Sequence, residues 1–340
     1  MDINHKIYFY IKNAINIYMK NIMVLSTGVA DLVTAISALR RCGLWQSVPI
    51  SKVSAILIGH GISLPDNLIQ AFQKTARRAF GLTRVEAFRW NEHHLAIEAF
   101  VAAQPAGSIL LSNQLQDAKI RQLIISLNPG KFIFYDNGLS SYHDHSVDLT
   151  LWRSLLQGCD DFSAYLTYSD LFGTPDYLKQ FVTEGIPVDL LKETMEEIRD
   201  ACVPLKKRLT SDAALILGTS FDRTKILSAE EELTIHRLLL EHIRKAHSGP
   251  VFFKPHPRAG SVYLDEGDGV IPLPVELPVE AYIAEAGGVA YSYSSTALFS
   301  LSSMFDWRTF RVSHPLIEKV FAAKPQLSKI KEIEASHSFG

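Results

Sequence analysis

The sequence predicts an α/β protein with two parallel-sheet domains in tandem. Over the first half of the chain, short apolar runs alternate with helical patterns of about 10–15 residues, which is typical of βαβ units. After a stretch interrupted by Pro175, Pro187 and Pro204, the alternation starts again near residue 213. The 340 residues of the chain are enough to bury two cores.

The first domain is expected to begin with five short apolar strands joined by helices. The strands are Ile22–Ser26, Val53–Gly59, Arg84–Phe88, Ser108–Ser112 and Lys131–Tyr135. The helices run from Thr27-Gly28 through Leu39, from Pro65 to Phe80, from an Asn91 cap to Val101, and over Ala118–Leu127. The stretch 171–208 is predicted to be helical and to lead into the second domain. We therefore expect a Rossmann-like domain over residues 21–205, preceded by an N-terminal extension over residues 1–20.

The second domain repeats the same pattern over residues 206–340. Its expected strands are Ala213–Leu217, Val251–Lys254, Val270–Leu273, Val289–Tyr293 and Thr309–Val312. Its expected helices are Ala229–His247, the short Val279–Glu285 and a terminal helix from His314-Pro315. Two Rossmann-like domains in tandem make the GT-B architecture, in which the domains face each other across a cleft that holds the active site. The second domain is then expected to bind a nucleotide sugar.

Composition excludes several classes of protein. The net charge of −2 gives no reason to expect nucleic acid as a partner. Cys42, Cys159 and Cys202 are far apart, which argues against zinc and disulfides and fits a reducing cytoplasm. No run reaches the 18 apolar residues of a membrane span.

Residues 1–20 lack the apolar core and the cleavage site of a signal peptide. They are interpreted as an extension outside the core fold or an upstream start, with translation beginning at Met19; the alternative is a helix on a membrane surface. We expect a cytoplasmic protein, with peripheral association with the inner membrane left open.

The pentapeptide Lys254-Pro255-His256-Pro257-Arg258 follows the apolar run Val251–Phe253. Prolines on both sides of His256 restrict its backbone and remove two amide donors. Because ligands of open α/β sheets bind at the C-terminal ends of strands, His256 is expected to donate to a departing phosphate. Lys254 and Arg258 would add positive charge. The alternative is a proline-rich loop whose basic residues are incidental.

A cluster of hydroxyls lies at the next predicted junction of a strand and a helix. It contains Ser292, Ser294, Ser295 and Thr296. Hydroxyls and free N–H groups at a helix start bind phosphate well, although plain N-capping by Ser295 or Thr296 gives the same pattern.

Three further segments are candidate walls of the site. Glu280 would accept hydrogen bonds from ribose hydroxyls, or only complement the dipole of its short helix. Gly218-Thr219-Ser220 follows the first strand of the second domain and would line the nucleotide site. Gly28 follows the first strand of the chain and would lie on the acceptor side.

Asp136-Asn137-Gly138 follows the strand Lys131–Tyr135. Asp136 is the candidate general base for an acceptor hydroxyl, and Gly138 would allow a sharp turn. An ordinary Asp-Asn-Gly turn is the alternative. The sequence has no DxD motif and no Walker loop, so we expect neither a metal nor a cofactor.

The order of these motifs resembles that of bacterial GT-B sialyltransferases, including the lipooligosaccharide sialyltransferase and capsular polysialyltransferase families. Asp136-Asn137-Gly138 is similar to their D/E-D/E-G motif, His256-Pro257 to their HP motif, and Ser294-Ser295 to their serine motif. Glu280 occupies a matching P-x-E position. The chain departs from the family at Asn137, where the family has a second acid.

The resemblance implies an inverting, metal-independent transfer of sialic acid, or a related nonulosonic acid, from a CMP-activated donor. The acceptor would be a glycan of lipooligosaccharide or capsule. Asp136 would deprotonate the acceptor, with Asn137 as an orienting or substrate contact. His256, Ser294 and Ser295 would hold the departing CMP phosphate, and Glu280 the ribose.

Other readings of the same motifs stay open. A CDP-glycerol or CDP-ribitol phosphotransferase of the teichoic-acid type also combines an HP motif with a serine pair, but it typically has Asp where this chain has Ser292. A 3-deoxy-manno-octulosonic acid transferase would also use a CMP sugar. Because the acidic pair is broken, a non-catalytic glycan- or nucleotide-binding relative is the alternative from a different class.

Overall fold

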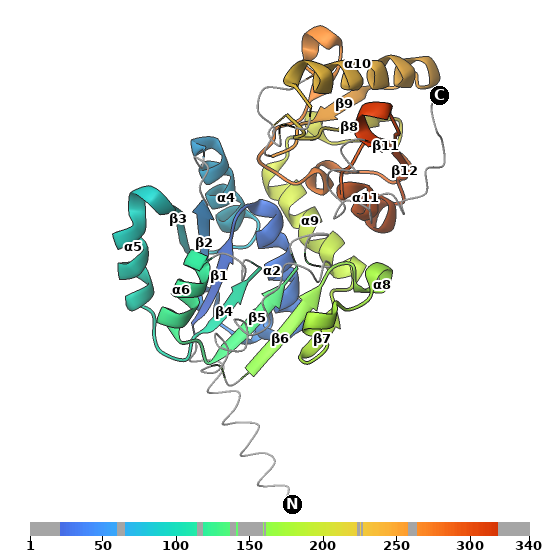
Figure 1. Ribbon diagram of the computed structural model, residues 1–340. Helices are drawn as coiled ribbons and strands as arrows, with labels where there is room; N and C mark the ends of the chain where they lie inside the picture. The colour runs from blue at the N-terminus through green and yellow to red at the C-terminus, as the bar shows by residue number, and fades with distance from the viewer. Residues whose placement is uncertain are drawn as a thin grey trace, which may run out of the picture. The chain divides into compact units, whose positions relative to one another are not determined.

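Both halves of the chain form parallel β-sheets flanked by helices, which confirms the predicted α/β class (Figure 1). The structure is a computed structural model that describes residues 21–59, 65–113, 118–136, 141, 159, 161–222, 225, 227–257 and 264–318. The chain divides into two compact units, Met1–Cys202 and Val203–Gly340. The predicted extension over residues 1–20 lies outside the described residues, and the predicted domain limits stay predictions.

The described part of the first unit contains one sheet of seven parallel strands. They pair in the order β3-β2-β1-β4-β5-β6-β7, and the order therefore reverses between β1 and β4. The strands are β1 (Ile22–Ser26), β2 (Val53–Gly59), β3 (Arg84–Arg89), β4 (Ile109–Ser112), β5 (Lys131–Tyr135), β6 (Asp161–Leu166) and β7 (Val182–Gly185).

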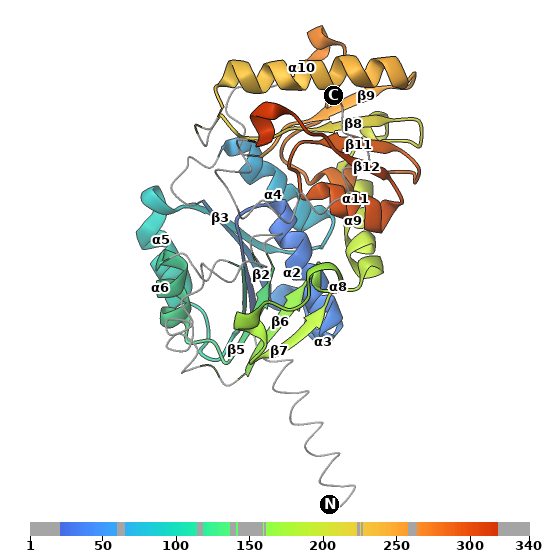
Figure 2. The same ribbon diagram turned by 45° about the vertical axis from the view of Figure 1, so that its right-hand side comes forward.

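Helices cover both faces of this sheet. The helices are α2 (Val29–Arg41), α3 (Leu44–Ser47), α4 (Asp66–Arg78), α5 (Trp90–Ala102), α6 (Ala118–Leu127), α8 (Ser169–Phe172) and α9 (Val188–Cys202). Figures 1 and 2 show α5 and α6 on one face, with α2, α4 and α9 on the other. Every residue of β1 is buried because helices pack on both of its sides.

The sequence prediction missed two strands beyond β5. β6 pairs with β5, with Tyr135 opposite Tyr165, and β7 forms the edge of the sheet. β7 has the short sequence Val-Thr-Glu-Gly and its Val182 is 65% exposed, so no apolar run marks it in the sequence. The predicted Asn91 cap is also wrong, because α5 already begins at Trp90.

The described part of the second unit has five parallel strands in the order β10-β9-β8-β11-β12. They are β8 (Ala214–Leu217), β9 (Val251–Lys254), β10 (Ile271–Pro272), β11 (Val289–Ser292) and β12 (Arg308–Arg311). The order reverses between β8 and β11. Figures 1 and 2 show α10 (Ala229–Ala246) and α11 (Ala297–Phe305) on opposite faces of this sheet. The short helix predicted from Val279 to Glu285 is a 3₁₀ turn that ends at Tyr282.

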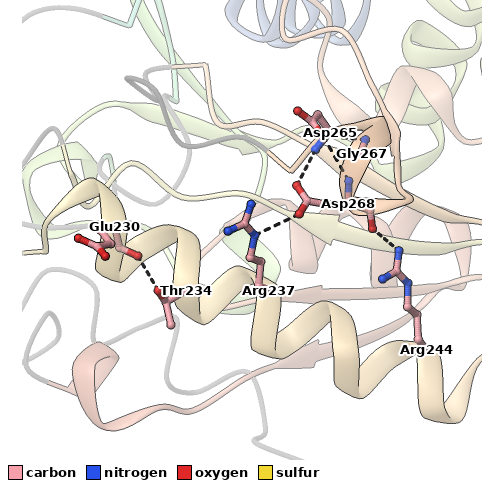
Figure 3. Close-up of polar contacts among 7 residues, drawn as sticks. All are labelled: Glu230, Thr234, Arg237, Arg244, Asp265, Gly267 and Asp268. Atoms are coloured by element: carbon pink, nitrogen blue, oxygen red, sulfur yellow. Dashed lines mark hydrogen bonds and ion pairs between the residues drawn. The ribbon is translucent and has the colours of Figure 1, made fainter.

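Polar contacts fix α10 against the connection between β9 and β10. Ser228 and Glu231 form a capping box at the start of the helix. Farther along the helix, Arg237 Nε lies 3.1 Å from Asp268 Oδ1, and Arg244 donates to the Asp268 carbonyl (Figure 3). Asp268 belongs to a 3₁₀ turn, Glu266–Asp268, that Asp265 caps. These contacts hold the turn at residues 265–268, which precedes β10, against α10.

None of the helices in the described part of the chain is long and apolar enough to cross a membrane.

Candidate functional site

The predicted donor-binding segments come together at one edge of the second sheet. β8 lies between β9 and β11, with Leu217 opposite both Lys254 and Ser292. Beyond the strands, the amide of Gly218 donates to the Lys254 carbonyl at 2.9 Å. The hydroxyl of Ser292 donates to the Leu217 carbonyl at 3.0 Å. The residues that follow the three strands therefore lie beside the point where the strand order reverses, where α/β sheets bind their ligands.

Gly218 has a packing reason to be glycine. A Cβ atom at this position would lie 3.0 Å from Phe253 Cζ and 3.3 Å from the backbone nitrogen of His256. The chain after β8 thus passes too close to the chain after β9 for a side chain to fit easily. Gly218 sets the approach of the segment that carries His256.

Thr219 is held by a carboxylate that the sequence prediction missed. Glu232 of α10 is buried and accepts a hydrogen bond from the Thr219 hydroxyl. It also accepts from the amides of Phe221 at 3.2 Å and Asp222 at 2.6 Å. Burial raises the pKa of Glu232. The Thr219 hydroxyl is therefore engaged within the fold, while Ser220 is half-buried.

Lys254, which is buried, and Glu280, which is half-buried, belong to a polar cluster within the second unit. Lys254 Nζ donates to the Pro274 carbonyl at 2.7 Å, and Glu280 accepts from the Ser300 hydroxyl of α11. Burial lowers the pKa of Lys254 to about 7, although the charges of Glu276 and Glu280 oppose this shift. Burial also raises the pKa of Glu280. Lys254, which was predicted to hold phosphate, thus donates to a backbone carbonyl of its own unit and lies near Glu280, the candidate residue for binding ribose.

The other motif residues of this edge are more exposed. His256 is half-buried and Pro257 is exposed, whereas Arg258 lies outside the described residues. Ser294 and Ser295 are half-buried.

Ser292 shapes the turn of the serine motif. Its hydroxyl oxygen accepts hydrogen bonds from the amides of Ser294 at 3.3 Å and Ser295 at 3.1 Å. The Ser295 hydroxyl accepts from the amide of Ala297 at 3.3 Å, while Thr296 makes no side-chain capping bond. Thr296 thus occupies the N-cap position without a side-chain capping bond, and the Ser295 hydroxyl accepts from the first residue of the helix instead.

An aromatic group under the sheet supports both motif loops. The ring of His236 in α10 lies 5.9 Å from that of Phe253 and 5.6 Å from that of Tyr293, centroid to centroid. Burial lowers the pKa of His236 to about 4, so the ring is neutral near pH 7. Tyr293 is fixed by a 2.7 Å hydrogen bond from its hydroxyl to the Ile235 carbonyl. In the sequence, His236 looks like any histidine of a helix.

On the first unit, Asp136 lies directly after β5 and is only 2% exposed. Its Oδ2 accepts from the amide of Thr167 at 2.8 Å, and its Oδ1 accepts from the Thr167 hydroxyl at 2.7 Å. Thr167 follows β6, so it was missed together with that strand. Asn137 and Gly138 lie outside the described residues.

Gly28 lies at the end of β1, two strands away from Asp136 in the sheet. Thr27, the residue before Gly28, donates hydrogen bonds from its amide (2.8 Å) and its hydroxyl to Asp31 of α2, and these bonds fix the loop that enters the helix. The backbone of Gly28 is extended, with φ −176°, and a Cβ atom there would meet nothing within 4 Å. Packing therefore does not require a glycine at this position.

The candidate residues thus form two groups, one on each unit. The described residues contain no group of three or more His, Cys, Asp and Glu side chains that could hold a metal ion.

Comparison with known proteins gives one finding. A family model described as alpha-2,8-polysialyltransferase (POLYST) matches residues 62–314, about three quarters of the chain. A search of curated proteins finds no match. The matched range includes Asp136, His256 and Ser294-Ser295, and it begins after Gly28.

Proposed function

The chain belongs to the alpha-2,8-polysialyltransferase family, and from this we propose that it transfers a nonulosonic acid such as sialic acid from a CMP-activated donor to a glycan. Membership makes it a glycosyltransferase of the sialyltransferase type. The observation that carries the proposal is the convergence of the Gly218, His256 and Ser294-Ser295 segments at one sheet edge within the matched range. The acceptor we propose is lipooligosaccharide or capsular glycan.

On the donor side, His256 would contact the phosphate of CMP and supply a proton or a hydrogen bond as it leaves. Ser294 and Ser295 lie after β11, next to the end of β8, and offer hydroxyls and amides for the same phosphate. Glu280 would accept hydrogen bonds from the ribose hydroxyls, with Lys254 beside it. The phosphate would thus meet hydrogen-bond donors and the ribose an acceptor.

On the acceptor side, Asp136 would take the proton from the attacking hydroxyl. The acceptor oxygen then bonds to the anomeric carbon as the bond from that carbon to the phosphate oxygen breaks, which inverts the configuration. Two hydrogen bonds from Thr167 orient the carboxylate for this role. The reaction requires the two units to face each other in a GT-B arrangement, which is part of the proposal.

The test is transfer by the variants Asp136→Ala and His256→Ala, measured as CMP release together with glycoside formation. Because a positioned acid or base contributes roughly 10²–10⁴-fold, each variant should lose that much of kcat. The controls are Asp161→Ala, which removes a carboxylate at the N-terminal end of β6, and His242→Ala in α10. Both should transfer normally. Melting temperatures verify that all variants fold.

Wild-type turnover in folded Asp136→Ala would move the base elsewhere, with Asp144 and His145, outside the described residues, as the next candidates. A product containing a phosphodiester would identify a phosphotransferase instead.

A further inference from the structure

Asn113, a residue that has no part in the proposed chemistry, directly follows β4. This residue is only 8% exposed, and neither Nδ2 nor Oδ1 of its side chain has a hydrogen-bond partner in the described structure. A carboxamide carries two donors and two acceptor lone pairs, and leaving such a group buried and unpaired is costly. Buried polar groups nearly always have a hydrogen-bond partner. An unpaired one at the C-terminal end of a strand therefore indicates a place where a ligand binds.

The position of Asn113 in the sheet favours the same interpretation. β4 pairs with β1, with Val24 opposite Leu111, and the same register carried two positions further brings Asn113 beside Ser26. The strand order reverses between these two strands. Ligands of open α/β sheets bind in the crevice beyond the strands at such a reversal.

The loop that follows β1 has free space beside it. Gly28 follows Ser26 and Thr27, and a side chain at Gly28 would meet no atom within 4 Å. Asp31 holds Thr27 in place through two hydrogen bonds, so the loop is fixed beside the space. The unpaired carboxamide of Asn113 at the end of β4 therefore lies near the loop that follows β1, and this loop has open space beside Gly28.

We propose that Asn113 and the space beside Gly28 form the subsite for the acceptor sugar. Oδ1 of Asn113 accepts a hydrogen bond from one sugar hydroxyl, and Nδ2 donates to its neighbour. Neighbouring hydroxyls satisfy both atoms, since each can donate or accept, whereas a phosphate or carboxylate offers only acceptors and would leave Oδ1 unpaired. The inference rests on the proposed function and names the residue that would bind its acceptor.

The first test is Asn113→Leu, which removes both polar atoms and keeps a similar volume. Loss of two neutral hydrogen bonds should raise the acceptor KM on the order of 5- to 100-fold. The melting temperature should stay equal or rise, because an unpaired buried group is removed, and the thermal shift caused by CMP should keep its size. The matched control is Ser54→Ala near the start of β2. It removes a buried hydroxyl that is also unpaired and should leave the acceptor KM unchanged.

The second test fills the space with Gly28→Val. The extended backbone and the free space predict a normally folded protein with a raised acceptor KM. Ala30→Val, an exposed position in the first turn of α2, is the control for introducing a branched residue near Gly28.

Direct binding of α-2,8-linked oligosialic acid without donor, measured by calorimetry, separates this inference from the proposed function. One outcome is that the wild type binds the glycan, that Asn113→Leu does not bind it, and that neither protein transfers. In that case the subsite stands and the transferase proposal fails. If the wild type transfers and the two variants keep its acceptor KM, the subsite is wrong. Absence of glycan binding and of transfer by the wild type would also overturn it.

Discussion

At the scale of single residues, burial has moved several ionisable groups of the second unit toward their neutral forms. The pKa of Lys254 is lowered to about 7 and that of Glu280 is raised, in both cases mainly because the side chains are removed from water. Each group also favours the charge of the other, though less strongly. Lys254 is therefore poised near the pH at which its charge changes, beside Glu280, the residue proposed to bind ribose.

This shift predicts a pH dependence of stability. Between about pH 7 and 10.5 the unfolded chain holds a proton on Lys254 that the folded chain has released, so the free energy of unfolding should rise with pH. The slope from one full proton is about 1.4 kcal/mol per pH unit. The stability that neutral Lys254 contributes is fully present above pH 10.5 and is lost as the pH falls through about 7.

Urea unfolding from pH 7 to 9 measures this slope in the wild type and in Lys254→Met, which should lose it. Lys245→Met, an exposed lysine of α10, is the control. Equal slopes in the wild type and Lys254→Met would show that Lys254 stays protonated in the fold.

At the scale of elements, the sequence predicted buried strands well and peripheral ones poorly. The predicted bounds of β1, β2, β5 and β9 agree with the structure, since continuous apolar runs mark strands buried on both faces. β6 begins with exposed Asp161 and β7 is a short edge, so no such run marks them.

The prediction of the site has the same limit. His256 and the serines could be located because each follows a readable strand. Thr167 could not, because its strand was missed. Glu232 could not either, because its role comes from a loop that folds back on the start of α10.

The loop after β8 gives a prediction of its own through Glu232. In Glu232→Gln an amide group would face backbone N–H groups that now donate to a carboxylate, so a donor would meet a donor. The variant should lose about 1–3 kcal/mol of unfolding free energy. If the loop binds the nucleotide, the donor KM should also rise while the acceptor KM stays the same.

The control is Glu241→Gln, an exposed glutamate on the same helix. Loss of stability with an unchanged donor KM would mean that Glu232 holds the fold but not the donor site.

Across the full chain, the candidate residues are divided between two units. In each unit the described strands form one parallel sheet whose strand order reverses once. The sequence predicted both α/β units from alternation alone. It could not give the partners of Lys254 and Glu280, because these contacts join segments far apart in the chain. In the proposed function the nucleotide binds the second unit alone, so its binding can be tested separately from transfer.

The metal-independent proposal concerns the complete enzyme. Removal of divalent ions with EDTA should leave transfer unchanged, because the charge of the leaving phosphate is assigned to His256 and the serine motif. The measurement is CMP release before and after dialysis against EDTA. Complete loss that Mg²⁺ restores would contradict it.

Nucleotide selectivity should be visible as stabilisation of the whole protein. A ligand that binds only the folded state stabilises it by RT ln(1 + [L]/Kd), about 2.7 kcal/mol at a hundredfold excess over Kd. We therefore expect CMP and CMP-sialate to raise the melting temperature, and UMP and CDP to do so less. The shift should persist in Asp136→Ala, whose residue lies on the first unit, and should shrink in His256→Ala and Glu280→Gln. Equal shifts from UMP and CMP would contradict the cytidylate donor, and a shift lost in Asp136→Ala alone would move the nucleotide to the first unit.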